Sequence, residues 1–296
     1  MRLLASLPTL LRGIVVALLL GLSTLVHASL MVPPALLKLV LPPGRARSAC
    51  DHALNALASR WVALNNAWIE AVRPDARWDV QGVDALHARG WYLVSSNHRS
   101  WVDILVLQRV FHGRIPFLKF FLKSELIWVP VIGLAWWALD FPFLRRGKGQ
   151  GARSNDLATT RAACEKFRHI PTSVINFVEG TRFTPAKHAQ QASPYRHLLK
   201  PKIGGLGVAL ATMGEQFEAM LDVTIAYPHG TPSFWQLISG QVDAVSVRVQ
   251  THVIPSDLVG ADPLADRDVR RRLGTWIEGL WAQKDDQLES LLNTAP

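Results

Sequence analysis

The chain has 296 residues, with 32 Lys and Arg against 23 Asp and Glu, which gives a formal charge of +9. Apolar residues make up 49% of the sequence and charged residues only 19%. This composition excludes a disordered or fibrous chain, because so much apolar surface has to be buried. The 2 cysteines cannot build a disulfide framework, and no Cys/His cluster has the spacing of a zinc site.

The N-terminal region predicts a membrane segment. Gly13–Val32 contains no charged residue and has the length of roughly 20 residues that a helix needs to cross a bilayer. Pro33 and Pro34 interrupt the apolar pattern, so we expect either a transmembrane anchor or a hairpin that re-enters the membrane. A cleaved signal peptide is the alternative, since Val26–Ala28 resembles a cleavage site. The apolar run continues beyond that site, which favours a retained anchor in residues 1–45.

The rest of the chain alternates predicted helices and strands. Apolar side chains recur three and four residues apart in 50–72, as in a helix, whereas apolar and polar residues alternate in 245–253, as in a half-buried strand near the edge of a sheet. Such an alternation favours a layered α/β domain. In chain order, the remaining predicted elements are a strand at 91–94, a helix at 101–111, a strand at 115–120, a helix at 128–139, a strand at 141–144, a helix at 154–167, strands at 173–178 and 222–227, and one or two helices at 266–292.

Residues 97–103 (NHRSWVD) lead from a predicted strand into the first turn of a predicted helix. The ends of strands are where α/β folds place their sites. His98 and Asp103 can meet across this turn, so that the carboxylate holds one ring nitrogen and the other nitrogen is free to act as a base. The alternative is that His98 only caps the turn and that Asp103 is favoured by the helix dipole.

A second polar turn, residues 178–182 (VEGTR), directly follows another predicted strand. Arg182 can bind a phosphate with its planar guanidinium, and Glu179 can fix the loop on the other side of the flexible Gly180. An ordinary surface turn with a local Glu–Arg pair is the alternative. Two arginines also follow the predicted strand 141–144, where a solvated basic surface explains them equally well.

Taken together, these pieces resemble the 1-acylglycerol-3-phosphate O-acyltransferase (lysophosphatidic acid or lysophospholipid acyltransferase) family over about residues 85–230. The family usually has Pro where Val178 stands. Residues 123–126 (KSEL) are similar to a lysine-containing stretch of the family, and 198–202 (LLKPK) resembles a subgroup with a wider range of acceptors, which leaves the acceptor head group open. The four blocks that carry the resemblance are 97–103 (NHRSWVD), 140–145 (DFPFLR), 177–182 (FVEGTR) and 225–228 (IAYP).

The resemblance implies an O-acyltransferase domain over residues 46–296, with a mixed α/β sheet flanked by helices, similar to glycerolphosphate acyltransferases. His98 would take the proton of the acceptor hydroxyl as that oxygen attacks an acyl thioester, and Asp103 would hold the imidazole tautomer and stabilise the imidazolium. Glu179 would orient its loop rather than react. The acceptor phosphate would be held by Lys123, Arg145 and Arg182, and the wider substrate site would include Asn97, Glu179, Gly180 and Thr181.

The resemblance also implies the substrates. The acyl group would pass to the sn-2 hydroxyl of lysophosphatidic acid or a related lysophospholipid and give phosphatidic acid or another diacyl phospholipid, in phospholipid biosynthesis or remodelling. The donor would be acyl-coenzyme A or an acyl-acyl carrier protein, used as a co-substrate, and we expect no cofactor, no metal and no nucleic acid. The catalytic domain would face the cytoplasm from the membrane that holds residues 1–45, the inner membrane in a bacterium.

Two other classes of protein fit parts of the sequence. A membrane-anchored metal-dependent hydrolase or phosphatase could use a His/Asp/Glu set, but it would normally show more carboxylates at ligand spacing. A non-enzymatic basic protein that binds membranes or nucleic acid would explain the charge of +9, but no nucleic-acid motif accompanies that charge. A chelator would inactivate the first class, and substitution of His98 would leave the second unaffected.

Overall fold

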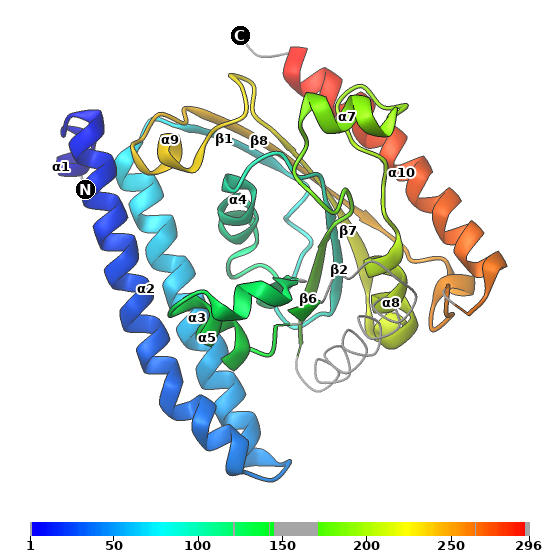
Figure 1. Cartoon of the computed structure of the whole chain (residues 1–296), viewed down its shortest axis with the longest axis horizontal. Helices are drawn as coiled ribbons and strands as arrows, with labels where there is room; N and C mark the ends of the chain where they lie inside the picture. Colours follow the sequence, from blue (N-terminus) through cyan, green and yellow to red (C-terminus); the bar gives the residue numbers. More distant parts are fainter. Residues whose placement is uncertain (1, 121, 142, 145–170, 264, 294–296) are drawn as a thin grey trace. The chain divides into compact units, whose positions relative to one another are not determined.

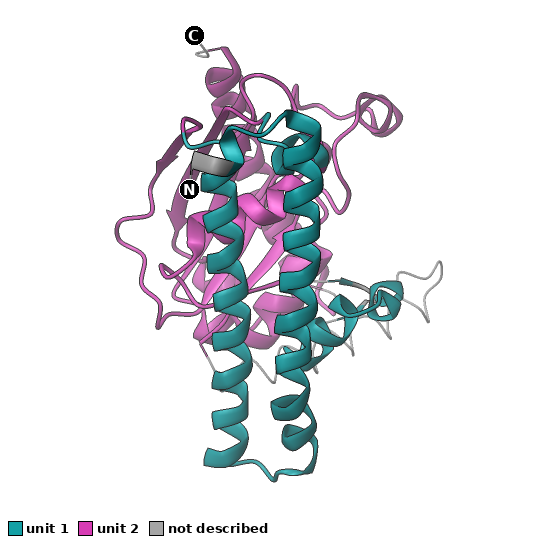
Figure 2. Cartoon of the chain, turned by 90° about the vertical axis from the view of Figure 1, so that its left-hand side faces the viewer, with its two compact units in different colours: residues 1–74, 121–159, 235–241 teal, residues 75–120, 160–234, 242–296 magenta. Residues whose placement is uncertain are grey.

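The computed structural model describes residues 2–120, 122–141, 143–144, 171–263 and 265–293 (Figure 1). The chain forms two compact units, shown in teal and magenta in Figure 2. Unit 1 comprises residues 1–74, 121–159 and 235–241, and unit 2 comprises residues 75–120, 160–234 and 242–296. The predicted helix at 154–167 lies outside the described residues.

Unit 1 is built on two long helices. α1 (Arg2–Ala5) precedes α2 (Thr9–Val40), and α3 (Arg45–Val72) returns beside α2 after a short turn; Figure 2 shows the two long helices side by side. By length and composition, α2 is the one described helix able to cross a membrane, and most of its apolar segment is not buried inside the structure.

The predicted interruption at Pro33 and Pro34 is wrong, because α2 continues through both prolines. A proline inside a helix removes one backbone hydrogen bond and usually kinks or breaks the helix. In α2 the buried face runs without a gap past the prolines, with Met31 before them and Ala35 after them. Packing on both sides therefore compensates for the lost bonds.

Polar contacts also hold unit 1 together. The indole N–H of Trp61 donates to the hydroxyl of Thr24 at 3.1 Å, which links α3 to α2. Near the end of α2, the buried Lys38 ammonium lies 2.5 Å from the carboxylate of Asp51 in α3 and also pairs with Asp140. These contacts fix α2 against α3 along their length.

The short elements of unit 1 differ in part from the predicted ones. The predicted helix at 128–139 is a 3₁₀ turn, Ser124–Trp128, followed by α5 (Ile132–Ala138). The break falls at Val131, whose positive φ of 68° is incompatible with a helix. The predicted strand at 141–144 is β5 (Phe143–Leu144), which pairs in parallel with β4 (Leu122–Lys123).

Unit 2 is a mixed six-stranded sheet in the order β1-β8-β7-β2-β6-β3, which confirms the expected fold class. All neighbouring strands are parallel except β7 and β8. Figure 1 shows α4 on one side of the sheet and α8 and α10 on the other. The strands are β1 (Arg77–Gln81), β2 (Tyr92–Ser96), β3 (Leu118–Phe120), β6 (Ser173–Phe177), β7 (Ala219–Ala226) and β8 (Ala244–His252). The helices of unit 2 are α4 (Val102–Phe111), α7 (Pro185–Gln191), α8 (Gly204–Met213) and α10 (Arg267–Asn293). α9 (Phe234–Ile238) belongs to unit 1 except for its first residue.

Burial explains where these elements depart from the predicted ones. β7 is buried over its whole length, as expected for a central strand, and it begins at Ala219, before the predicted start. β2 runs on through the buried Ser95 and Ser96, so the polar turn begins only at Asn97. β8 lies next to the edge strand, as predicted. α10 is a single helix that passes through Gly274 without a break.

Candidate active site

Three segments of the predicted site follow parallel strands that lie side by side. β2 pairs with β6 and with β7, and Ser96 at the end of β2 lies opposite Phe177 and Val223. Because the carboxyl ends of parallel strands meet at one edge of a sheet, residues 97–103, residues 178–182 and the residue after β7 come together there. The sequence places all three at strand ends, and the topology brings these ends together.

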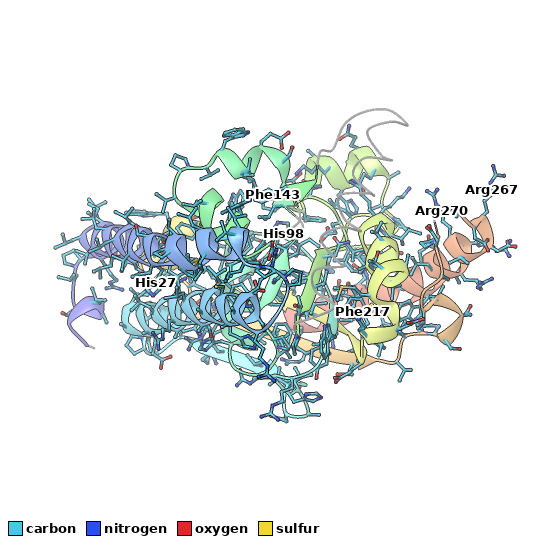
Figure 3. The ribbon with its side chains drawn as sticks, turned by 90° about the horizontal axis from the view of Figure 1, so that it is seen from below. His27, His98, Phe143, Phe217, Arg267 and Arg270 are labelled. Atoms are coloured by element: carbon cyan, nitrogen blue, oxygen red, sulfur yellow. The ribbon has the colours of Figure 1, made fainter. Side chains whose placement is uncertain are left out.

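The predicted contact between His98 and Asp103 is present. Nδ1 of His98 (labelled in Figure 3) lies 2.8 Å from Oδ2 of Asp103. The same oxygen accepts the backbone N–H of Arg99 at 2.6 Å and of Ser100 at 2.8 Å. The ring of Phe177 stacks on the imidazole, with 3.9 Å between the ring centroids. The Asp103 side chain is 1% exposed and the His98 side chain 13%, so the carboxylate is enclosed while the imidazole is partly exposed, and Nε2 is the ring nitrogen that Asp103 does not contact.

A tyrosine that the sequence analysis did not assign to the site completes this arrangement. The hydroxyl of Tyr227, the residue after β7, donates to Oδ1 of Asp103 at 2.5 Å. Burial first, and then the charge of Asp103, raise the pKa of Tyr227 well above its usual value, so the hydroxyl keeps its proton and remains a donor. The signal in the sequence is its place at the end of the predicted strand 222–227, within the block 225–228 (IAYP) of the family resemblance.

Glu179 supports the backbone of His98. Its Oε1 accepts the backbone N–H of His98 at 2.7 Å, and its Oε2 accepts the backbone N–H of Leu199 at 3.0 Å. The side chain is fully buried. Burial raises the pKa of Glu179 to about 7, although these two hydrogen bonds and the charge of Arg99 act in the opposite direction. These contacts of Glu179 agree with the predicted orienting role, and the group that Glu179 orients is the backbone of His98.

The raised pKa of Glu179 predicts a pH dependence of stability. Between its ordinary value of 4.5 and about 7, the folded chain binds a proton that the unfolded chain has released, so this carboxyl favours the folded state less as pH rises through that window. Glu179→Gln cannot titrate. Between pH 4.5 and pH 8, the wild type should therefore lose stability from this group, whereas Glu179→Gln should not. We expect the Tm of the variant minus the Tm of the wild type to increase over this range, as measured by thermal unfolding.

The exposed Glu278 provides the control for this measurement. Glu278→Gln removes a carboxyl group from the surface, and its Tm difference from the wild type should show no comparable change with pH. A constant Tm difference for Glu179→Gln over the same range would contradict the assignment of a titrating buried carboxyl.

The structure corrects the predicted role of Asn97. Its side-chain N–H₂ donates to the carbonyl of Ile225 at 2.9 Å, and its oxygen accepts the backbone N–H of Ile225 at 2.8 Å. The side chain is fully buried. An amide that pairs with a peptide group on both sides is not available to a substrate, so Asn97 joins the end of β2 to β7 rather than binding the acceptor.

Two lysines from other segments, Lys187 in α7 and Lys202 just before α8, lie against the loop after β6. The ammonium of Lys187 donates to the Thr181 hydroxyl at 2.8 Å. Gly180 has a positive φ of 67°, and a Cβ at this position would lie 3.1 Å from Cδ of Lys202. Glycine therefore allows both the turn and the close approach of the lysine side chain.

Arg182 is exposed at the same loop. Its guanidinium carbon lies 4.8 Å from the centroid of the Trp101 ring, which itself is largely exposed. Arg182 on this loop, Lys187 in α7 and Lys202 before α8 give this part of unit 2 three cations, which can bind an anion such as a phosphate. Thr181 and Arg182 thus lie in the same part of unit 2 as His98 and Asp103.

The remaining predicted substrate-binding residues stay predictions. Lys123 belongs to β4 in unit 1, and Arg145 lies outside the described residues. Within the described part of the chain, no group of three or more His, Cys, Asp or Glu side chains is placed to hold a metal ion.

Known proteins similar to this chain include several acyltransferases. The chain is 29% identical over 214 residues to 1-acyl-sn-glycerol-3-phosphate acyltransferase 3 of Arabidopsis thaliana, which covers 67% of this chain and 52% of that protein. It is 25% identical over 299 residues to lysocardiolipin acyltransferase 1 of Danio rerio, covering 96% of this chain and 72% of that protein. The chain thus spans about half the length of the plant relative.

The fold has a counterpart among solved structures. The crystal structure of the 1-acyl-sn-glycerophosphate (LPA) acyltransferase PlsC from Thermotoga maritima superposes with a TM-score of 0.54 at 17% identity, covering 93% of this chain and 96% of that one. The family model described as Acyltransferase matches residues 77–228, just over half of the chain, and this range holds the His98–Asp103 pair, the loop after β6 and Tyr227. The chain belongs to the acyltransferase family.

Proposed function

We propose that this protein transfers a fatty acyl group from an acyl thioester to the sn-2 hydroxyl of lysophosphatidic acid or a related lysophospholipid. The observation that carries the proposal is the Asp103–His98 pair, with Nδ1 of His98 2.8 Å from Oδ2 of Asp103, in the same part of unit 2 as the exposed Arg182. The names of the relatives support it, since they are acyltransferases of 1-acyl-sn-glycerol-3-phosphate and of lysocardiolipin. Family membership supports the reaction class, and the His98–Asp103 contact and the exposed Arg182 support the proposed base and anion site.

The proposed chemistry needs one base and no covalent intermediate. Nε2 of His98 takes the proton of the acceptor hydroxyl while the oxygen attacks the thioester carbonyl carbon, a contribution typically worth about 10²–10⁴-fold. Asp103 stabilises the imidazolium that forms. When the C–S bond breaks, the imidazolium returns the proton to the departing thiolate. The products are the diacyl lipid and the free thiol, either coenzyme A or acyl carrier protein.

The phosphate of the acceptor is bound in this proposal by the cations of the loop after β6. Arg182 is exposed and can pair with two phosphate oxygens through its planar guanidinium. Lys187 and Lys202 add positive charge to the same loop. Lys123 and Arg145 are proposed as further ligands on the resemblance to the family alone. Binding of the phosphate places the hydroxyl near His98, and such positioning is a large part of the rate enhancement of a two-substrate reaction.

Substitution of Arg182 tests the anion site. We expect Arg182→Ala to raise the KM of the acceptor strongly and that of the acyl donor much less, because only the acceptor carries the phosphate that Arg182 binds. Arg182→Lys should also be poor, since a point charge does not replace a planar fork. Steady-state kinetics with each substrate varied in turn measures both effects.

Arg270 is the matched control for this prediction, because it is exposed and Figure 3 shows it near the N-terminal end of α10, well away from His98. Arg270→Ala should leave both KM values unchanged. Equal increases in the KM of acceptor and donor for Arg182→Ala would point to a distorted loop and would contradict a phosphate site.

We further propose that α2 attaches the protein to the membrane. Large apolar side chains recur on its exposed face at the spacing of a helix, among them Leu18, Leu22 and Leu25. Attachment would bring the protein to its lipid acceptor, and a catalytic domain on the cytoplasmic side would have access to thioester donors. Carbonate extraction tests the attachment: the full chain should stay with the membrane, whereas a mature N-terminus at Ser29 would contradict a retained anchor.

A panel of donors against acceptors, assayed on purified full-length protein by the release of free thiol, tests the proposed function. Thiol release that requires a lysophospholipid and withstands chelators is the expected result. Acyl-chain preference, the carrier and the acceptor head group follow from the same panel. Release of phosphate or fatty acid that a chelator abolishes would instead support a metal-dependent hydrolase.

A further inference from the structure

The C-terminal helix α10 lies outside residues 77–228, which match the acyltransferase family, yet it is joined to the candidate site by hydrogen bonds. Trp281, Lys284 and Asp285 are spaced by three and four residues, so they lie on one face of the helix. All three are buried. Buried polar groups on a helix face need specific partners, and those of α10 have them.

Two residues of α10 hold the backbone of residues 196–199. Oδ2 of Asp285 accepts the backbone N–H of Arg196 at 2.8 Å, and Oδ1 accepts that of His197 at 2.8 Å. The indole N–H of Trp281 donates to the carbonyl of Leu199 at 2.9 Å. Hydrogen bonds from a carboxylate to backbone N–H groups are among the stronger ones in proteins. The segment is therefore fixed to α10 at both ends.

The same segment is also joined to the backbone that carries the proposed base. The N–H of Leu199 donates to Glu179, whose other oxygen accepts the N–H of His98. Arg99, the next residue, donates from its guanidinium to the carbonyl of His197 at 2.9 Å. Two separate routes thus lead from residues 196–199 to the turn that holds the imidazole.

A buried charge fixes α10 itself against the sheet. The ammonium of Lys284 lies 3.0 Å from Oδ1 of Asp222 and donates to the carbonyl of Val223 at 2.5 Å, both on β7. A buried ammonium needs such partners, since it is otherwise costly to remove from water. The ion pair restricts how far α10 can slide or rotate along β7, and with it the segment that α10 holds.

We propose that Trp281 and Asp285 are positioning residues for acyl transfer. Acting through residues 196–199 and Glu179, they hold the backbone of His98 so that Nε2 meets the acceptor hydroxyl. This inference rests on the proposed function, because it assumes that His98 is the base. It makes the C-terminal helix part of the catalytic apparatus, although the helix touches neither substrate in the proposed mechanism.

Two conservative variants test the role, Asp285→Asn and Trp281→Phe. Asp285 accepts the two backbone N–H groups on different oxygens, and Asn replaces one of these oxygens by an N–H₂ donor, so one of the two bonds is lost. Phe lacks the indole donor. A displacement on the order of 1 Å at a reacting group lowers the rate much more than it lowers affinity, so we expect kcat to fall about tenfold or more and both KM values to stay within about twofold.

Two residues of the same helix provide matched controls. Asp286 is 76% exposed and pairs only at the surface with Arg196, so Asp286→Asn should leave kcat unchanged. Leu288 is fully buried on α10, and Leu288→Ala loosens the helix without removing a hydrogen bond to residues 196–199. If the role of α10 were merely structural, Leu288→Ala would lower kcat as much as Asp285→Asn at an equal loss of Tm.

Hydrogen exchange at the backbone amides of His98 and Leu199, measured on the full chain by NMR or mass spectrometry, tests the link between α10 and His98 independently of enzyme activity. Exchange at both sites should rise in Asp285→Asn more than in Leu288→Ala. Unchanged exchange at His98, or an unchanged kcat in Asp285→Asn beside an active wild type, would overturn the inference. An inactive wild type would instead contradict the proposed function.

Discussion

Replacement of His98 by alanine should reduce acyl transfer by about 10³-fold or more, because it removes the proposed base and leaves the acceptor hydroxyl to react through water. The imidazole is partly exposed, at 13%, and fills no core position, so thermal stability should fall only modestly. Initial rates of thiol release and of lipid product, together with thermal unfolding of the same preparation, measure both effects.

The pH dependence of wild-type activity is a second test of His98 as the proposed base. Because the proposed base has to accept a proton, kcat/KM should decline toward acidic pH. Asp103, Arg99, Tyr227 and Glu179 are the ionisable groups around it, and Glu179, with a pKa of about 7, accepts the N–H of His98 best when ionised. Protonation of Glu179 should therefore contribute to the acidic limb. Retention of more than about a tenth of wild-type activity by His98→Ala would contradict the role of the base.

Replacement of Asp103 by asparagine should cost a factor of about 10³ as well, although the side chain keeps its shape. One carboxylate oxygen accepts from Nδ1 of His98 and from two backbone N–H groups, and the other accepts from the Tyr227 hydroxyl. An amide cannot accept at both positions, so it would either turn its N–H₂ toward donors or release Tyr227. Neither arrangement fixes the same tautomer or stabilises an imidazolium.

The double variant separates this account from a simple loss of packing. Groups that act as a unit are strongly non-additive, so His98→Ala with Asp103→Asn should transfer acyl groups about as slowly as His98→Ala alone. Additive losses would show that Asp103 acts independently of His98. Asp84, an exposed residue in the turn after β1, provides a control, and Asp84→Asn should leave the rate unchanged.

The sequence predicted the contact between His98 and Asp103 because its signal is local. The two residues are five residues apart on a strand-to-helix turn, and Glu179 follows a largely apolar strand. Chemistry that lies within a few residues of a strand end is visible before the fold is known. The mixed sheet followed in the same way from the alternation of apolar and polar runs.

The elements that were missed depend on contacts between distant parts of the chain. β1 (Arg77–Gln81) is a polar edge strand, and its pairing with β8 rather than its own composition makes it a strand. Asn97 resembled a substrate ligand, but its partner is a peptide group 128 residues away. The partner of Tyr227 is 124 residues away, and nothing near α10 in the sequence shows what that helix contacts.

Acceptor-dependent release of thiol from acyl-coenzyme A, followed together with the intact mass of the protein, tests the central claim most directly. The account predicts release only when lysophosphatidic acid or another lysophospholipid is present, formation of the diacyl lipid in equal amount, and no mass increase when the donor is added alone. An acyl-enzyme that forms without acceptor, on Cys164 or on any serine, would contradict direct transfer to the lipid hydroxyl by His98.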